Sequence, residues 1–244
     1  MNPGPDTATT DLGRVPDRGL VRDLFAWLAP RYDAAVATYS WGQDLRWKHT
    51  LLRRLGPRPG QRALDLACGT GLISERLGRV LGAGSVIGLD MNRDMLEHSR
   101  RPVADRRSVL ADSESLPFRS QSFDLVTAGY LFKYVHLDRL CAEIRRVLRP
   151  GGRFGGYDFS RPLVHTPAGW LYAQYLGHLL PWLGRRRDQE GDDWERLLSF
   201  LSDIAPRSGW EDRVGRALGD AGFDHVELVP SLGGAITWVW ARAA

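Results

Sequence analysis

A short apolar run that leads directly into a glycine turn is the feature that most restricts the fold of this 244-residue chain. Residues 63–67 read Ala-Leu-Asp-Leu-Ala, residues 68–71 read Cys-Gly-Thr-Gly, and residues 72–81 continue with apolar side chains at helical spacing. A buried strand, a tight turn and a helix in this order are typical of a sheet with parallel strands and helices packed on its faces. We therefore expect an α/β fold.

The same alternation continues along the chain and changes near its end. Further strands are predicted at residues 85–90, 108–111, 123–128 and 153–159. Residues 226–229 and 236–240 flank a turn and are predicted to form an antiparallel hairpin. The predicted fold is thus a Rossmann-like, doubly wound, mainly parallel seven-stranded sheet with an antiparallel C-terminal hairpin strand and helical lid segments.

The charge balance and the cysteines argue against several classes of protein. A net charge of +4, from 33 basic and 29 acidic residues, gives little basis for nucleic-acid binding. Only Lys48 and Lys133 are lysines, so 31 of the basic residues are arginines. Cys68 and Cys141 are too few for a disulfide framework or a four-ligand zinc site, and no metal-ligand spacing occurs. A reducing cytoplasmic setting without a bound metal is expected.

The glycine turn and one aspartate together predict a nucleoside-containing ligand. Gly69 and Gly71 let the backbone approach a ligand closely, and the N-terminus of the following helix offers free N–H groups. Asp90 ends the second predicted strand 19 residues after Gly71, where a carboxylate can accept hydrogen bonds from both ribose hydroxyls. This pair favours an adenosine-containing cofactor over a structural turn beside a solvated aspartate.

Three further features indicate which adenosine cofactor is bound. Ser74 stands where a dinucleotide-binding turn has its third glycine. Asp112 and Ser113 follow the third predicted strand, where they can meet the adenine amino group. The terminal hairpin is foreign to most dinucleotide folds. These features favour S-adenosyl-L-methionine (SAM), whereas a nicotinamide-dependent dehydrogenase, the alternative, would give Asp112 no role.

These motifs resemble those of class I SAM-dependent methyltransferases, and among them the ubiquinone/menaquinone C-methyltransferase (UbiE/Coq5-like) family. The resemblance runs from about Phe25 to near the C-terminal end. It rests on residues 32–33, 40–42, 47–48, 64–71, 90, 116–118, 123–124, 146–153, 159–162 and 221–223. It implies SAM as cofactor and S-adenosyl-L-homocysteine as product. The residues that it places at the cofactor are Asp65, Ala67, Gly69, Thr70, Gly71, Asp90, Met91, Asp112, Ser113 and Gly129.

The apolar pattern, together with the resemblance, predicts how the chain is divided. Residues 1–19 have no apolar period and are predicted to form a flexible tail without a signal peptide. Residues 20–244 are expected to form one class I methyltransferase domain. Its predicted parts are an N-terminal helical cover (20–56), a SAM-binding core (57–160), lid helices (161–215), and a last helix with the terminal hairpin (216–244).

The chain departs from this family where substrate chemistry is expected. After the fourth strand the quinone enzymes carry Phe-Gly-(Leu/Ile)-Arg-Asn, whereas residues 130–134 read Tyr-Leu-Phe-Lys-Tyr. A planar guanidinium cannot be replaced by a point charge without changing what it recognises. Lys133, Tyr134 and His136 are the catalytic candidates, because loops at this end of a sheet face the ligand. The alternatives are a surface cation, a packing aromatic and a helix-start residue.

Aromatic residues outside the core motifs are candidates for the acceptor pocket. Tyr32, Trp41, Tyr130 and Trp170 are predicted to line it, with ordinary core packing as the alternative. Residues 162–184 contain no charged side chain, but two prolines and internal glycines argue against a membrane span. Their apolar stripe, formed by Leu171, Tyr175, Leu179 and Leu183, is predicted to cover the pocket. Peripheral contact with an anionic membrane surface through residues 185–187 is the alternative.

The leading functional hypothesis is methyl transfer from SAM to a hydrophobic, aromatic or prenylated small molecule such as a quinone precursor. A specialised-metabolite O-, N- or C-methyltransferase from a biosynthetic cluster is the alternative that residues 130–134 favour. A SAM-fold protein that binds the cofactor without methylating, as a binding module or a cyclase, is a third. A monomer or homodimer that binds no nucleic acid is expected.

Overall fold

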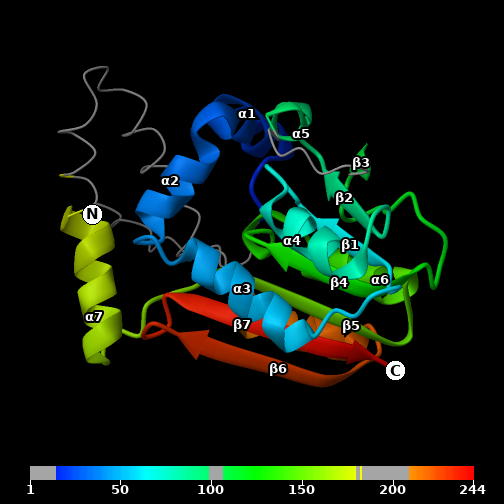
Figure 1. The fold of residues 1–244 in the computed structure, drawn as a ribbon. Coiled ribbons are helices and arrows are strands. Elements are labelled where there is room, and N and C mark those ends of the chain that lie inside the picture. Colours follow the sequence, from blue (N-terminus) through cyan, green and yellow to red (C-terminus); the bar gives the residue numbers. More distant parts are fainter. Residues whose placement is uncertain (1–14, 99–106, 180–181, 183–208) are drawn as a thin grey trace, which may run out of the picture.

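A seven-stranded sheet in the order β3-β2-β1-β4-β5-β7-β6 forms the centre of the molecule (Figure 1). The computed structural model describes residues 15–98, 107–179, 182 and 209–244. The strands are β1 (Ala63–Leu66), β2 (Val86–Asp90), β3 (Arg107–Leu110), β4 (Phe123–Gly129), β5 (Leu148–Phe159), β6 (Phe223–Ser231) and β7 (Ile236–Ala243). The predicted mainly parallel, Rossmann-like sheet is confirmed.

The predicted C-terminal hairpin is also confirmed, and its second strand lies inside the sheet. β7 pairs antiparallel with β5 on one side and with β6 on the other. β6 therefore joins the sheet only through β7, although it precedes β7 in the chain. Both strands are longer than the predicted ranges 226–229 and 236–240.

Helices cover both faces of the sheet and the carboxyl ends of its parallel strands. They are α1 (Arg18–Leu28), η1 (Ala29–Arg31), α2 (Tyr32–Tyr39), α3 (Asp44–Leu55), α4 (Leu72–Leu81), α5 (Arg93–Glu97), η2 (Phe132–Tyr134), α6 (Leu137–Val147), α7 (Pro167–Gln174), the π-helical η3 (Tyr175–Leu179) and α10 (Trp210–Asp220). In α6 the buried side chains recur at i, i+3, i+4 and i+7, which makes one apolar face toward the sheet. α10 packs beside α6, whereas α3 and α4 belong to the other face.

Two helix boundaries differ from the predicted divisions of the chain. α1 begins at Arg18, before the predicted boundary at residue 20, because the Asp17 side chain caps it by accepting from the Leu20 N–H at 3.0 Å. α10 begins at Trp210 rather than at residue 216, because the Trp210 side chain is fully buried and anchors the first turn. Most of the predicted tail (1–14) and much of the predicted lid (183–208) lie outside the described residues.

Of the predicted apolar stripe, Tyr175 packs on the protein, whereas Leu171 and Leu179 do not. Tyr172 and Tyr175 are buried, whereas Leu171 and Leu179 are 50% and 45% exposed. The Tyr172 hydroxyl donates to the Tyr39 carbonyl at 3.3 Å, and the Tyr175 hydroxyl donates to the carbonyl of Thr38. The turn also widens to a π-helix at Tyr175, which breaks the i+4 spacing on which the predicted stripe rests. Leu183 lies outside the described residues.

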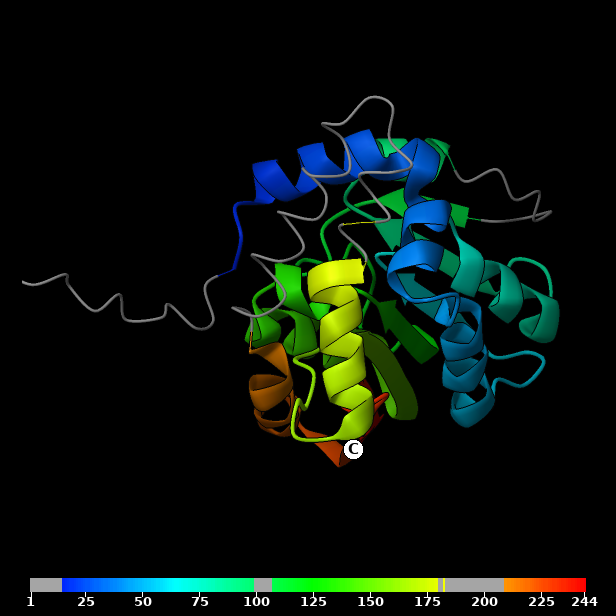
Figure 2. The same ribbon diagram turned by 90° about the vertical axis from the view of Figure 1, so that its left-hand side faces the viewer.

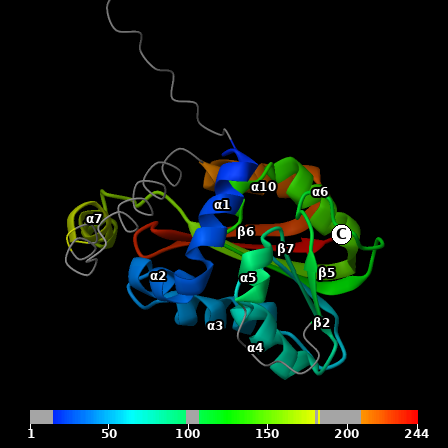
Figure 3. The same cartoon turned by 90° about the horizontal axis from the view of Figure 1, so that it is seen from above.

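Figure 2 shows α1 (blue) across the top of the molecule and α7 (yellow) standing in front. Seen from above, α1 runs alongside α5 (Figure 3), and the two helices are in contact. Within the described part of the chain, every helix is too short or too polar to cross a membrane.

Candidate cofactor and acceptor site

A cavity of about 760 Å³, counting the part open to solvent, lies between α1 and the carboxyl ends of β2 and β4; we call it the turn cavity. Seven of the ten residues placed at the cofactor by sequence line it, namely Ala67, Gly69, Asp90, Met91, Asp112, Ser113 and Gly129. Predicted cofactor contacts from four separate segments of the chain therefore meet in one hollow.

The glycine turn has the backbone that its sequence predicts. Gly69 and Gly71 both have positive φ, of 52° and 83°. A Cβ atom on Gly69 would lie 2.9 Å from the Met95 side chain, so no larger residue fits without movement. The turn also holds Ala67 at φ 49°, in the left-handed region that non-glycine residues seldom occupy. The backbone is thus shaped to leave the cavity open at this point.

Asp90 is fixed at the floor of the turn cavity by two backbone donors. Its Oδ2 accepts from the Gly69 N–H at 2.8 Å, and its Oδ1 accepts from the Asn92 N–H at 2.9 Å. Burial raises the pKa of this carboxyl, although both N–H groups oppose the rise. Each carboxylate oxygen keeps a further lone pair, which leaves the side chain able to accept hydrogen bonds from a ligand's hydroxyl groups.

Three predicted cofactor contacts lie behind the turn instead of in the cavity. Asp65 is buried in β1, where it accepts from the Ser74 hydroxyl at 2.6 Å and the Thr127 hydroxyl at 2.8 Å. Burial raises its pKa to about 6. Thr70 donates to Asp33 of α2 at 2.7 Å, and Gly71 is the N-cap of α4. These residues hold the turn in place from behind. Ser74 does so too, through its hydrogen bond to Asp65, although the sequence marked it only as the residue that replaces a third glycine.

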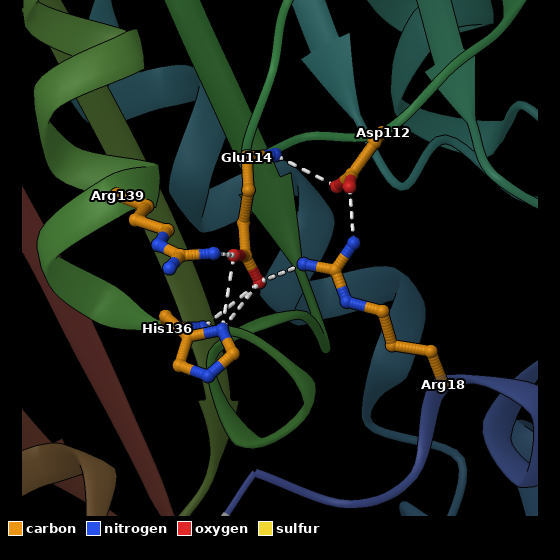
Figure 4. A network of polar contacts seen from close by, with 5 residues as sticks. All are labelled: Arg18, Asp112, Glu114, His136 and Arg139. Carbon is orange, nitrogen blue, oxygen red and sulfur yellow. Dashed lines mark hydrogen bonds and ion pairs between the residues drawn. The ribbon is translucent and has the colours of Figure 1, made fainter.

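A network of charges closes the far end of the turn cavity (Figure 4). Asp112 accepts from the Glu114 N–H at 2.9 Å and is paired with Arg18 of α1. Glu114 has only 3% of its side chain exposed and pairs with Arg18 at 2.6 Å, the His136 imidazole at 3.0 Å and Arg139 at 3.8 Å. His136, a predicted catalytic residue, lies in this network and lines neither the turn cavity nor the one described next.

A second cavity of about 460 Å³ adjoins the first and is lined mainly by apolar side chains; we call it the aromatic cavity. Its lining residues are Leu24, Phe25, Leu28, Tyr32, Ala35, Val36, Tyr39, Tyr130, Lys133, Tyr134 and Phe159. Phe25, Tyr32, Tyr130 and Tyr134 line both cavities and so form the wall between them. Tyr32 and Tyr130 were predicted at the acceptor, and Tyr134 was a catalytic candidate.

Lys133 carries the charge of the aromatic cavity and is not a surface cation. It is 4% exposed and forms an ion pair with Asp158 of β5, which is fully buried. Its ammonium also lies 5.2 Å from the ring of Tyr134 and 5.3 Å from that of Phe159, within range of cation–π attraction. Burial raises the pKa of Asp158, and Lys133 opposes that rise.

Tyr130 lies between both lysines of the chain. Its ring is 5.5 Å from the ammonium of Lys48 and 5.9 Å from that of Lys133. The hydroxyl donates at 2.8 Å to Asp44, which is itself paired with Lys48. The backbone of Tyr130 has φ 58°, a strained conformation for a residue with a large side chain. Two buried ion pairs thus lie against Tyr130, one of the four residues that line both cavities.

The structure does not bring the other two predicted acceptor residues to the site. Trp41 is 56% exposed and stacks on Tyr175 at 5.4 Å, and Trp170 is 55% exposed on α7. Neither lines a cavity described above. In their place α1 contributes Arg18, Val21, Arg22 and Phe25 to the turn cavity. The sequence signal was the helical spacing from Leu20 onward, which does not tell what the helix covers, and Arg18 fell within the predicted tail.

Comparison with known proteins identifies the family of the chain. The model of the ubiE/COQ5 methyltransferase family matches residues 14–242. The chain belongs to this family. The ubiquinone/menaquinone biosynthesis C-methyltransferase UbiE of Serratia proteamaculans is 32% identical over 241 residues, which cover 93% of this chain and 94% of that protein.

Solved structures share the fold at low sequence identity. The [4+2]-cyclase SpnF has a TM-score of 0.65 and 16% identity, covering 95% of this chain and 98% of that one. The geranyl diphosphate C-methyltransferase of Streptomyces coelicolor A3(2), in complex with S-adenosyl-L-homocysteine, has a TM-score of 0.59 and 16% identity, covering 82% and 76%.

Family membership makes the chain a SAM-dependent methyltransferase. The turn cavity fits this cofactor: it has the Asp90 carboxylate at the end of β2, the bare backbone of Gly69 in the turn, and Asp112 after β3. Among the described residues no group of three His, Cys, Asp or Glu side chains could hold a metal ion.

Proposed function

We propose that SAM occupies the turn cavity and that a hydrophobic, aromatic or prenylated small molecule, such as a quinone precursor, accepts the methyl group from the aromatic cavity. The observation that carries this proposal is the wall of four aromatic side chains that line both cavities. Because the same four side chains line both cavities, an acceptor in the aromatic cavity would lie directly beside the cofactor, as methyl transfer requires. The nearly uniform apolar lining favours an acceptor with little polar surface.

Bound SAM supplies a methyl group that is already activated by its sulfonium. The protein's residues then have to align the acceptor atom with the methyl carbon and keep water away, since in-line displacement needs little else. The half-buried ring of Tyr130 and the buried ring of Tyr134 serve both tasks. Phe25 on α1 and Tyr32 on α2 complete the same wall from the N-terminal helices.

Lys133 and Tyr134 are the residues that we propose to act on the acceptor. Both line the aromatic cavity, and the Lys133 ammonium can donate a hydrogen bond to an acceptor oxygen while Asp158 balances its charge. A role of His136 in the reaction has less support. Its imidazole is hydrogen-bonded to Glu114, and His136 lines neither cavity.

The direct test is turnover of SAM with candidate acceptors. We expect binding of SAM and S-adenosyl-L-homocysteine by isothermal titration, and methylation of demethylmenaquinone detected by mass spectrometry. Failure of both ligands to bind would refute the assignment of the turn cavity. Turnover on an aromatic polyketide or alkaloid, without turnover on the quinone, would favour the specialised-metabolite alternative. Product formation without loss of the SAM methyl group would favour the cyclase alternative.

Variants of the buried pair test the role of Lys133. Lys133→Met should destabilise the fold by about 3–5 kcal/mol, because it leaves Asp158 buried without its cation. The double variant Lys133→Met, Asp158→Leu should recover most of that loss in chemical denaturation. Both variants should bind S-adenosyl-L-homocysteine normally and lose turnover. If the double variant keeps full turnover, the pair is structural and Lys133 has no part in the reaction.

We further propose a cytoplasmic monomer or homodimer that binds no nucleic acid. The exposed apolar side chains of α7 support peripheral contact with a membrane surface, where a prenylated acceptor would be found.

A further inference from the structure

We propose that Arg18 fastens α1 over the turn cavity and thereby controls how fast the cofactor enters and leaves. The inference rests on the assignment of SAM to that cavity, and it is independent of the identity of the acceptor. Arg18 acts here as a positioning residue: it holds a helix and a carboxylate in place.

One face of α1 forms a wall of the turn cavity. Arg18, Val21, Arg22 and Phe25 all line it, and their spacing of three and four residues places them on the same side of the helix. The facing wall is built by Asp90, Met91, Asn92 and the loop after β3. A ligand in the cavity is therefore enclosed between α1 and the sheet.

Three contacts hold α1 in this position. Arg18 bridges Asp112 and Glu114 with separate nitrogens at the first turn of the helix. The Asn92 side chain donates to the Arg22 carbonyl at 2.7 Å. Phe25 packs edge-on against Tyr134, with ring centroids 5.5 Å apart. Because Asn92 also donates through its backbone to Asp90, the middle contact joins α1 to the ribose end of the site.

Of these three contacts, the one made by Arg18 consists of ion pairs. Its partner Glu114 is buried and gathers Arg18, Arg139 and His136 around one carboxylate (Figure 4). Lifting α1 would remove one cation from a carboxylate that water hardly reaches, and would take from Asp112 its ion-pair partner. Arg18 itself is 41% exposed and Asp112 is 35% exposed, so water screens part of their attraction. Glu114 is 3% exposed, and the cost of leaving this buried carboxylate with one cation fewer is what makes the first turn of α1 resist opening.

Asp112 connects the ion pairs of Arg18 to the cofactor. The same carboxylate that Arg18 holds is the one expected to meet the adenine amino group. Entry and exit of the cofactor then pass through the state in which Arg18 has released Asp112 and Glu114. A residue that only contacts a bound ligand slows its dissociation, whereas a residue that holds a cover closed slows both association and dissociation.

The experiment is stopped-flow measurement of S-adenosyl-L-homocysteine binding to the full chain, followed by tryptophan fluorescence. We expect Arg18→Ala to raise the association and dissociation rate constants together, each about tenfold, so that the equilibrium constant changes less than either rate. Arg18→Lys should lie between, because an ammonium cannot bridge two carboxylates as a guanidinium does. Added salt should speed exchange in the unmodified protein more than in Arg18→Ala.

Arg139→Ala is the matched control, since it removes another cation from Glu114 but comes from α6 and not from α1. It should leave both rate constants unchanged. An equal effect of Arg139→Ala would overturn the proposal, and so would a change in dissociation alone or no change with Arg18→Ala. If Arg18→Ala fails to fold, Glu114→Gln and Arg18→Lys provide the same comparison. Absence of binding to the unmodified protein would instead refute the cofactor assignment.

Discussion

Asp90 shows at the scale of one residue why a short sequence signal located the cofactor end of the site. Its position is fixed by two hydrogen bonds within its own neighbourhood, from Asn92 and from the glycine turn paired beside it on the sheet. A residue at the end of a parallel strand has its place set by the strand itself. Such residues can be predicted without knowing the rest of the fold.

Replacing Asp90 tests its role in cofactor binding. Asp90→Ala should weaken binding of SAM by about 1–3 kcal/mol, or roughly 5- to 150-fold in Kd, because buried ribose hydroxyls lose their acceptor. Isothermal titration measures the change. Asp94→Ala on α5, an exposed position, serves as the control and should bind normally. Equal affinity of the Asp90 variant would show that the ribose lies elsewhere.

Asp65 gives the protein a specific dependence on pH. Its pKa in the folded state, about 6, is raised above its ordinary value of 3.8. Its contribution to stability is therefore fully present below pH 4 and is lost as the pH rises through 6. The loss is on the order of 3 kcal/mol, from about 1.4 kcal/mol for each pH unit.

Urea denaturation at several pH values between 4 and 8 checks this expectation. The unmodified protein should lose stability over that interval relative to Asp65→Asn, which cannot ionise. A second variant, Asp94→Asn, should follow the unmodified protein. If the Asp65→Asn and unmodified curves run parallel, Asp65 does not titrate in this range.

Lys133 shows that the ion-pair partner of a single residue could not be predicted from the sequence. Its partner, Asp158, is 25 residues away on a neighbouring strand, and only the pairing of β4 with β5 brings them together. From the sequence alone, Lys133 could be either a surface cation or a catalytic residue. Burial in an aromatic cavity excludes the first.

At the scale of elements, α7 shows where periodicity fails as a guide. Spacing alone predicted a stripe of Leu171, Tyr175, Leu179 and Leu183 over the pocket. Tyr175 is buried, but Leu171 and Leu179 are exposed, and Tyr172, which lies outside the stripe, is buried instead. A tyrosine hydroxyl that is buried needs a hydrogen-bond partner, and the carbonyls of Tyr39 and Thr38 at the end of α2 provide one for Tyr172 and one for Tyr175. Helical periodicity does not show whether the tyrosine hydrogen bonds or the burial of the leucines decides how the helix packs.

The outward side of α7 gives a testable expectation for membrane contact. A double variant, Trp170→Ser with Leu171→Ser, should reduce cosedimentation with vesicles of phosphatidylcholine and phosphatidylglycerol, because two exposed apolar side chains no longer enter the lipid interface. The control, Val80→Ser with Leu110→Ser, removes two exposed apolar side chains elsewhere and should bind vesicles normally. Equal binding by all forms would argue that α7 does not meet a membrane.

At the scale of the whole molecule, the alternation of strands and helices was sufficient to predict the sheet, because each crossover helix must pack back onto it. It did not reveal that α1 covers the turn cavity. Helix spacing tells that one side of residues 18–28 is buried, but contacts such as that of Arg18 with Glu114 depend on where the helix lies on the finished fold. The covering elements are therefore the least predictable part of the site.

Trp210 joins three parts of the molecule and should be its most sensitive core position. Its ring stacks on Phe132 at 4.8 Å, and its indole N–H donates to the Phe159 carbonyl at 2.8 Å. Trp210→Ala should cost about 3–5 kcal/mol in chemical denaturation, and Trp210→Phe about 1–2 kcal/mol from the lost hydrogen bond. A loss below 1 kcal/mol for the alanine variant would mean that α10 is not needed to hold the sheet.

The place of β7 inside the sheet has a consequence for folding. β6 precedes β7 in the chain but has no neighbour to pair with until residues 236–243 are in place. Until then, the edge of β5 is also open along most of its length, and another chain could pair with it. Any change that delays the docking of β7 would prolong this exposure, so such a change should increase aggregation during refolding.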